Sequence, residues 1–281
     1  MKTKKFTLMM ALVICSVVAF SQTKKQPDVT GILKSGKLPQ NLELKNDLQK
    51  FVVTTDHFNT DIFGNFFNKF RVKGEYTRGL PDEMVKWNNV TVAMSMARNA
   101  EFGTGSPVDY MENFTYKVSE DMMKPEKFST FTEHSAYTKN LVWDMMAIEG
   151  FAWAYFNELE LNKPYKAGMF NGKIDLAGMG SFENKDVILT WTGITGWNGE
   201  YCAVIEYRTM NNPLEYAGEG MNMKGRSHYW GTIWVSVEDK QIEHAILFED
   251  VVMEIQLPGQ TTKQVMDATR EITFEKPAIK N

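Results

Sequence analysis

The stretch GRSHYWGTIWVSVEDKQIEHAILFEDVVMEI, from Gly225 to Ile255, decides the fold of this chain. Apolar and polar residues alternate on both sides of Asp239-Lys240, and a period of two is typical of strands that bury one face. We therefore predict a hairpin that turns at Asp239-Lys240 and pairs Trp230 with Glu249. The core face in this register comprises Ile233, Val235, Val237, Ile242, Ile246 and Phe248. Trp230, Trp234, Leu247 and Glu249 then share the opposite face.

A second hairpin is predicted immediately upstream, within residues 186–209. Its two alternating runs are separated by Asn198-Gly199, the dipeptide that best fits a two-residue turn because both of its central residues need a positive φ. A turn of this length sets the register and pairs Thr192 with Ile205.

The middle of the chain predicts a long helix over 138–161, TKNLVWDMMAIEGFAWAYFNELEL. Apolar residues recur there at steps of three and four, so they form a broad stripe on one helical face. Asn162-Lys163-Pro164 ends the pattern, because proline cannot continue a helix. Met145, Met146, Trp153 and Phe156 lie on this stripe and would face the sheet.

The fold class predicted from these patterns is α+β, with a curved, mostly antiparallel sheet, half-barrel-like, packed on one long central helix. Strands are expected over 66–97 and an antiparallel sheet over 173–275. A single domain would span 47–281, preceded by a polar tether at 22–46.

The N-terminus has the layout of a cleavable signal peptide over residues 1–21. Lys2, Lys4 and Lys5 precede an uncharged run from Phe6 to Phe20, and the small residues Ala19 and Ser21 lie just before the predicted cleavage point after Ser21. The run is shorter than the roughly 20 residues of a membrane-spanning helix. We therefore expect a periplasmic or secreted protein that meets the membrane only through this peptide.

Charge and cysteine content exclude several classes of function. Removing the three N-terminal lysines from the 31 basic residues leaves 28 against 35 acidic ones, a net charge of −7, which argues against nucleic acid as a partner. Cys202 would be the one cysteine left, so no internal disulfide forms. No metal-ligand spacing, phosphate loop or nucleophile motif is present, so we predict no catalytic residue, no metal and no cofactor.

The tryptophan face of the hairpin raises the question of what covers it. Two half-covered indoles represent roughly 200 Å² of apolar surface, worth about 5 kcal/mol when buried. Either the N-terminal portion of the chain covers this face, or a ligand or partner does.

The segment KGRSHYWGTIWVSVEDKQIEHAILFEDVV, which follows a signal peptide in the same chain, resembles uncharacterised exported bacterial proteins. Its strand-turn-strand rhythm is also similar to the periplasmic lipoprotein carriers of the LolA/LolB type. That resemblance implies a long antiparallel sheet curled around helices, with acyl chains held in an apolar cavity. It covers the C-terminal third of the chain and rests on strand pattern rather than on diagnostic residues.

Three functional hypotheses follow. The leading one is a non-enzymatic, exported protein that binds an apolar or amphipathic ligand of lipid or lipoprotein type. The ligand would contact Met145, Met146, Trp153 and Phe156 under the helix, or Trp230, Trp234 and Glu249 on the hairpin. The alternatives are a carbohydrate-active hydrolase with a tryptophan-flanked carboxylate such as Glu249, and an interaction module that docks on an envelope protein.

Overall fold

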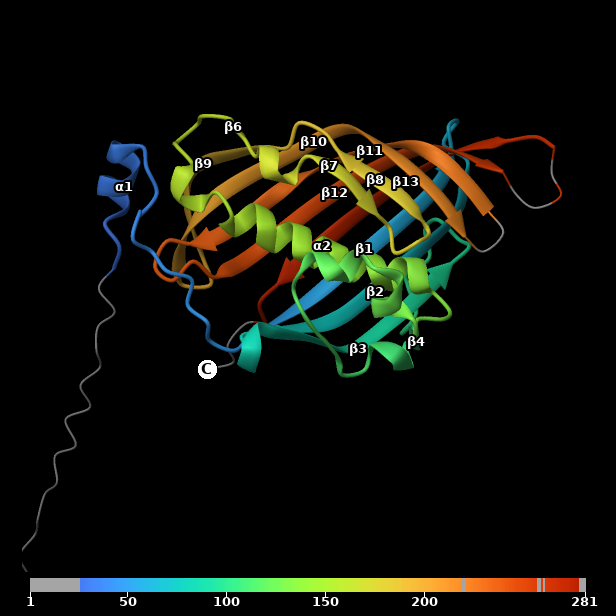
Figure 1. The fold of residues 1–281 in the computed structure, drawn as a ribbon, viewed down its shortest axis with the longest axis horizontal. Helices are drawn as coiled ribbons and strands as arrows, with labels where there is room; N and C mark the ends of the chain where they lie inside the picture. Colours follow the sequence, from blue (N-terminus) through green and yellow to red (C-terminus); the bar gives the residue numbers. More distant parts are fainter. Residues whose placement is uncertain (1–25, 219–220, 257–258, 260, 278–281) are drawn as a thin grey trace, which may run out of the picture.

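The computed structural model describes residues 26–218, 221–256, 259 and 261–277 (Figure 1). The strands are β1 (Gln49–Asp61), β2 (Phe66–Arg78), β3 (Met84–Ser95), β4 (Ser106–Pro107), β5 (Phe114–Lys117), β6 (Tyr165–Lys166), β7 (Gly172–Asp175), β8 (Gly180–Asn184), β9 (Ile188–Trp197), β10 (Glu200–Gly218), β11 (Met221–Ser236), β12 (Ile242–Gln256) and β13 (Gln264–Glu275). The α-helices are α1 (Val29–Ser35) and α2 (Ser135–Trp153). Short 3-10 helices lie at Pro81–Glu83, Asp109–Met111, Glu120–Met123, Pro125–Phe128, Phe156–Glu158 and Gly168–Phe170.

All the strands belong to one 13-stranded sheet whose main path is β4-β3-β2-β1-β13-β12-β11-β10-β8-β7. The three short or peripheral strands β5, β6 and β9 pair with β3, β9 and β10 respectively. The last strand, β13, lies between β1 and β12 and pairs antiparallel with both. It therefore joins the N-terminal strands and the C-terminal hairpins into a continuous surface.

The predicted α+β class is wrong. Thirteen strands of the described chain belong to one large, curved, antiparallel sheet, and α2 is the one long helix set against it. Segments between the predicted strands add short strands and 3-10 turns of three or four residues instead of helical layers. The protein is therefore mostly β, with little helix.

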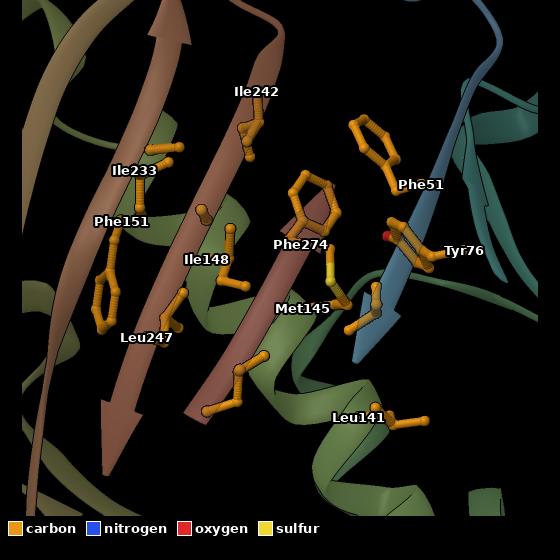
Figure 2. Close-up of a cluster of buried hydrophobic side chains, with 14 of the residues drawn as sticks. Phe51, Tyr76, Leu141, Met145, Ile148, Phe151, Ile233, Ile242, Leu247 and Phe274 are labelled. Atoms are coloured by element: carbon orange, nitrogen blue, oxygen red, sulfur yellow. The ribbon is translucent and has the colours of Figure 1, made fainter. Parts of the chain in front are cut away.

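Helix α2 crosses one face of the sheet, called here the inner face (Figure 1). Along β12 the inner face carries Ala245, Leu247, Glu249, Val251, Met253 and Ile255, and the outer face carries the residues between them. Figure 2 shows Met145 of α2 beside Phe274 of the sheet, and Leu141 and Ile148 of the same helix belong to the same buried cluster as Phe274 and Leu247. Burial of these facing apolar side chains is the main force that holds the two layers together.

Helix α2 ends at Trp153, eight residues before the predicted boundary. Farther along the chain, the backbone forms hydrogen bonds with other segments instead of helical ones. The N–H of Leu161 donates to the carbonyl of Gly36, and the N–H of Asn162 donates to the carbonyl of Trp191. The apolar periodicity of the helix continues to residue 161, but these hydrogen bonds to Gly36 and Trp191 replace the hydrogen bonds that would continue the helix.

The Asn198-Gly199 hairpin forms as predicted, with φ of 48° and 81° at its two turn residues. The predicted register is wrong beyond Gly193. A bulge between Val204 and Ile205 pairs Ile205 with Trp191, so Thr192 is the extra residue.

The hairpin at Asp239-Lys240 also forms, but its predicted register is wrong by one residue over most of its length. Trp230 pairs with Phe248, not Glu249, and a bulge lies between Trp234 and Val235. A shift of one residue exchanges the two faces of a strand. Ile246 and Phe248 therefore lie on the outer face, and Leu247 and Glu249 on the inner face. Trp230 and Trp234 remain on the outer face, as predicted.

Gly225 on β11 explains part of the sheet's curvature. A side-chain carbon there would lie 2.2 Å from the carbonyl oxygen of Val252, so only glycine permits this approach to β12. Gly231, on the same face of β11, is similarly close to β12.

The predicted signal peptide, residues 1–21, lies outside the described residues. The described part of the predicted tether contains α1, and it buries Leu38 in the core. Within the described ranges, no helix is both long and apolar enough to cross a bilayer.

Candidate functional site

The residues predicted to line a cavity beneath the helix lie in or beside the hydrophobic core. Met145 and Phe156 are fully buried, while Met146 and Trp153 are half-buried at its margin. The Trp153 indole N–H donates to the Lys240 carbonyl at 2.8 Å, and the Arg78 guanidinium lies 4.3 Å from the ring centroid. These side chains fasten α2 to the sheet.

The outer face carries an aromatic surface made by neighbouring strands. Trp230 is 38% exposed and stacks on Phe248, with ring centroids 5.9 Å apart. Trp234 is half-buried between Trp197, at 5.7 Å, and His244, at 4.8 Å. The two tryptophans are therefore partly covered by aromatic side chains of β9 and β12 that lie on the same face.

Glu249 lies on the other side of the sheet, in a buried ionic cluster with Arg270 and Asp144. The Arg270 guanidinium donates to Glu249 at 2.5 Å and to Asp144 at 2.9 Å. The Ser227 hydroxyl donates to Glu249 at 2.5 Å, and the Tyr229 hydroxyl donates to Asp144 at 3.3 Å. Glu249 therefore does not flank the tryptophans, which removes the site proposed for a hydrolase that uses it.

Burial dominates the electrostatics of this ionic cluster. It raises the pKa of Asp144, because desolvation of the carboxylate outweighs the attraction of Arg270. Burial alone would lower the pKa of Arg270, but the attraction of Asp144 and Glu249 raises it above the usual value. The guanidinium is therefore the fixed charge around which the two carboxyl groups are arranged.

The ionic cluster belongs to a polar band that crosses the inner face. His57 pairs with Arg270, Arg270 with Glu249, Glu249 with Tyr229, and Tyr229 with Thr209. Paired residues of antiparallel strands point to the same side, so these five side chains form one row. The His57 pKa is well below its usual value, first because of burial and then because of the charge on Arg270.

Beyond the polar band lies a second apolar cluster, separate from the core under α2. It consists of the buried residues Val251, Met253 and Ile255, packed by the partly buried Leu214, Met223, Met266 and Ala268. All seven belong to β10–β13. Among the described residues, the apolar side chains that pack against this cluster all come from these four strands, and none comes from a helix.

The second apolar cluster continues laterally across the sheet. Met266 pairs with Met253, which pairs with Gly225; the row then passes through Leu214 and Phe182 to Ile174. At about 4.8 Å between strands, this apolar row across six strands is roughly 24 Å wide. Phe182 and Ile174 are half-buried. The result is an apolar strip on the inner face, bordered on one side by the polar band.

Glu249 was predicted as a site residue on the wrong face, whereas its partners Arg270 and Asp144 were missed in the sequence, although signals for them exist. Arg270 alternates with Ile272 and Phe274, two core residues, so it lies on their face of β13. Asp144 lies within the apolar stripe of α2, three residues after Leu141 and four before Ile148.

Asp250 and Asp267 form a second carboxyl pair, on the outer face. Burial, a hydrogen bond with Asp250 and repulsion from its charge together raise the pKa of Asp267 to about 6. The folded state therefore binds this proton more tightly than the unfolded state. The resulting stabilisation is complete below the ordinary aspartate pKa near 4 and is lost as pH rises through 6.

We expect the free energy of unfolding to contain a component that falls between about pH 4 and pH 6 because of this pair. Urea unfolding of wild type and Asp267→Asn at several pH values measures it, and the variant should lack this component. Asp175→Asn is the control and should retain it. An unchanged pH profile in Asp267→Asn would contradict the assignment.

Two cavities lie away from the inner-face strip. One, of about 460 Å³, is lined by α1 and the residues up to Gln40. The other, of about 600 Å³, lies where Phe102 folds over Lys69 and Arg71 of β2. Within the described ranges no three His, Cys, Asp or Glu side chains are grouped so that they could hold a metal ion.

No protein-family model matches this chain, and no curated protein matches it. Among solved structures, the chain is similar to lipovitellin, described for its lipid–protein interactions, at 9% identity and a TM-score of 0.36. That match covers 83% of this chain but only 26% of lipovitellin, so the chain spans about a quarter of its length. A DUF1329 family protein from Desulfovibrio piger matches at 7% identity and a TM-score of 0.15, over 83% of this chain and 88% of that one. At these scores neither likeness establishes a shared fold.

Proposed function

We propose that this protein is an exported, non-enzymatic carrier or receptor for an apolar or amphipathic ligand of lipid type. The ligand lies on the second apolar cluster of the inner face. One observation carries the proposal: Leu214, Met223, Met266 and Ala268 are only partly buried there, and no apolar side chain from a described helix packs against the cluster.

The chemistry of the strip favours an acyl chain over a charged group. Arg270 is already paired with Asp144 and Glu249, so the polar band offers no free charge to a head group. Methionine side chains at Met223, Met253 and Met266 adapt their shape to a flexible chain. The apolar part of the ligand therefore supplies the affinity, and its polar end remains toward water.

Because binding rests on apolar burial, affinity should rise with chain length. Each added methylene contributes up to about 0.8 kcal/mol, or close to fourfold in affinity, until the strip is filled. Isothermal titration with laurate, myristate and palmitate measures this trend.

We expect Met266→Glu and Met223→Glu each to weaken palmitate binding by about tenfold or more, because they place a carboxylate in the apolar strip. Val265→Glu is the matched control. Val265 is the neighbour of Met266 on β13, its side chain points to the outer face, and it is 36% exposed. The palmitate affinity of Val265→Glu should stay within about twofold of that of wild type.

Thermal unfolding of each variant separates lost binding from lost folding. The proposal fails if the purified wild type binds none of the three fatty acids. It fails equally if Val265→Glu weakens binding as much as Met266→Glu does in a folded protein.

The exported location is supported by residues 1–21 and their signal-peptide pattern. Expression of the full chain in a Gram-negative host, followed by intact-mass measurement of the periplasmic fraction, tests it. A mature chain that begins at Gln22 is expected, and an uncleaved cytoplasmic chain would contradict export.

A further inference from the structure

The outer face around Trp230 has a composition different from that of the inner-face strip. Trp230 pairs with Phe248 on one side and with Arg208 on the other, and Phe248 pairs with Glu271. Paired residues share a face, so the indole and phenyl rings lie side by side between a guanidinium and a carboxylate.

A second row lies next to the first on the same face. Thr232 is two residues from Trp230 and pairs with Glu206. Residues two apart on a strand point to the same side, so Glu206 lies beside Arg208. We call Trp230, Phe248, Arg208, Glu271 and Glu206 the Trp230 platform.

The charged side chains of the Trp230 platform are exposed and available. In the part of the chain that the structure describes, Glu206, Arg208 and Glu271 form no side-chain hydrogen bond or ion pair. Arg270 and Glu243, on neighbouring strands, are both paired. An exposed indole is thus surrounded by hydrogen-bonding groups that the protein itself leaves unused.

This combination excludes two classes of partner. An apolar protein surface would bury three charged groups without compensation, which is costly. A polyanion would be repelled by the two carboxylates and by the net charge of the mature chain, which is 28 − 35 = −7. A neutral sugar avoids both the desolvation cost and the repulsion. Its C–H face stacks on an aromatic ring, while its hydroxyl groups form hydrogen bonds with the carboxylate and guanidinium groups.

We propose that the Trp230 platform binds a neutral oligosaccharide. The site is open and lies on a sheet, so it accepts an extended chain across the strands. At about 4.8 Å per strand, the row from Glu271 to Arg208 is roughly 14 Å long, enough for two or three sugar units. The site is independent of the lipid strip, which lies on the opposite face.

The test uses the full mature protein and a panel of neutral hexasaccharides: cellohexaose, hexa-N-acetylchitohexaose, xylohexaose, mannohexaose and laminarihexaose. Isothermal titration at millimolar sugar should detect binding of at least one. For that sugar, Trp230→Ala is expected to weaken affinity by about tenfold or more, and Arg208→Ala by a smaller factor.

Phe63→Ala is the control, because Phe63 is an exposed aromatic residue, 84% accessible, in the turn between β1 and β2. The sugar affinity of Phe63→Ala should equal that of wild type. Palmitate binding should be unchanged in Trp230→Ala. Absence of binding to every sugar in the panel overturns the proposal. So does a sugar that binds a folded Trp230→Ala variant as tightly as wild type.

Discussion

Replacing Arg270 with methionine is expected to lower the free energy of unfolding by about 3–5 kcal/mol. The substitution leaves Asp144 and Glu249 buried together without their shared cation, and both have side chains no more than 10% exposed. Uncompensated buried charge is among the most destabilising changes a single substitution can make. Urea unfolding at neutral pH measures the loss.

Arg71→Met is the matched control for Arg270→Met. Arg71 also binds an aspartate, Asp56, through two hydrogen bonds, but that pair is on the outer face and its side chains are 42% and 38% exposed. The control should lose no more than about 1 kcal/mol. If the two arginine variants lose equal stability, the buried cluster does not have the role assigned to it.

A triple variant separates the loss of attraction from the exposure of unpaired charge. Combining Arg270→Met with Asp144→Asn and Glu249→Gln removes all three charges, so most of the stability lost in Arg270→Met should return. Failure of the triple variant to recover stability would show that the cation has a packing role instead.

The second large effect is expected at Phe274, in the centre of the core. Phe274 is fully buried on β13 and stacks on Phe51 of β1, with ring centroids 4.1 Å apart (Figure 2). Phe274→Ala removes this ring from between the sheet and α2 and should cost about 3–5 kcal/mol of unfolding free energy.

Chemical unfolding of Phe274→Ala tests that expectation, with Phe63→Ala as the exposed control. The control should change stability by no more than about 0.5 kcal/mol. A loss below about 1 kcal/mol in Phe274→Ala would contradict a core centred on the junction of β1 and β13.

The sequence predicted the strands of the two C-terminal hairpins well because their signals are local. Asn198-Gly199 sets a turn by its own backbone preferences, and alternation around Asp239-Lys240 marks two strands. The apolar stripe of the helix was equally clear in the sequence, because the spacing of Leu141, Met145 and Ile148 places them on one helical face.

The register of the hairpin at Asp239-Lys240 could not be predicted for a specific reason. A bulge adds a single residue and leaves no clear mark in the alternating pattern. That one residue moved Glu249 from the tryptophan face to the ionic cluster and moved Phe248 in the reverse direction. The hypothesis that Glu249 lies beside an indole depended on this offset.

The candidate site depends on contacts that join distant parts of the chain. Asp144 and Arg270 are 126 residues apart and meet because β13 is inserted between β1 and β12. The alternation of Val251, Met253 and Ile255 is visible in the sequence, but whether a helix covers them depends on where α2 begins. Only the three-dimensional arrangement shows that no apolar side chain from a described helix packs against this cluster.

The central claim is that an apolar ligand lies on the second apolar cluster. Photo-crosslinking with a diazirine-labelled palmitate, followed by mass spectrometry of the labelled peptides, tests it most directly. We predict adducts in residues 221–226, 251–256 and 264–269 that unlabelled palmitate suppresses. Adducts confined to α2 or to the segment around Trp230, or adducts that palmitate does not suppress, would contradict the claim.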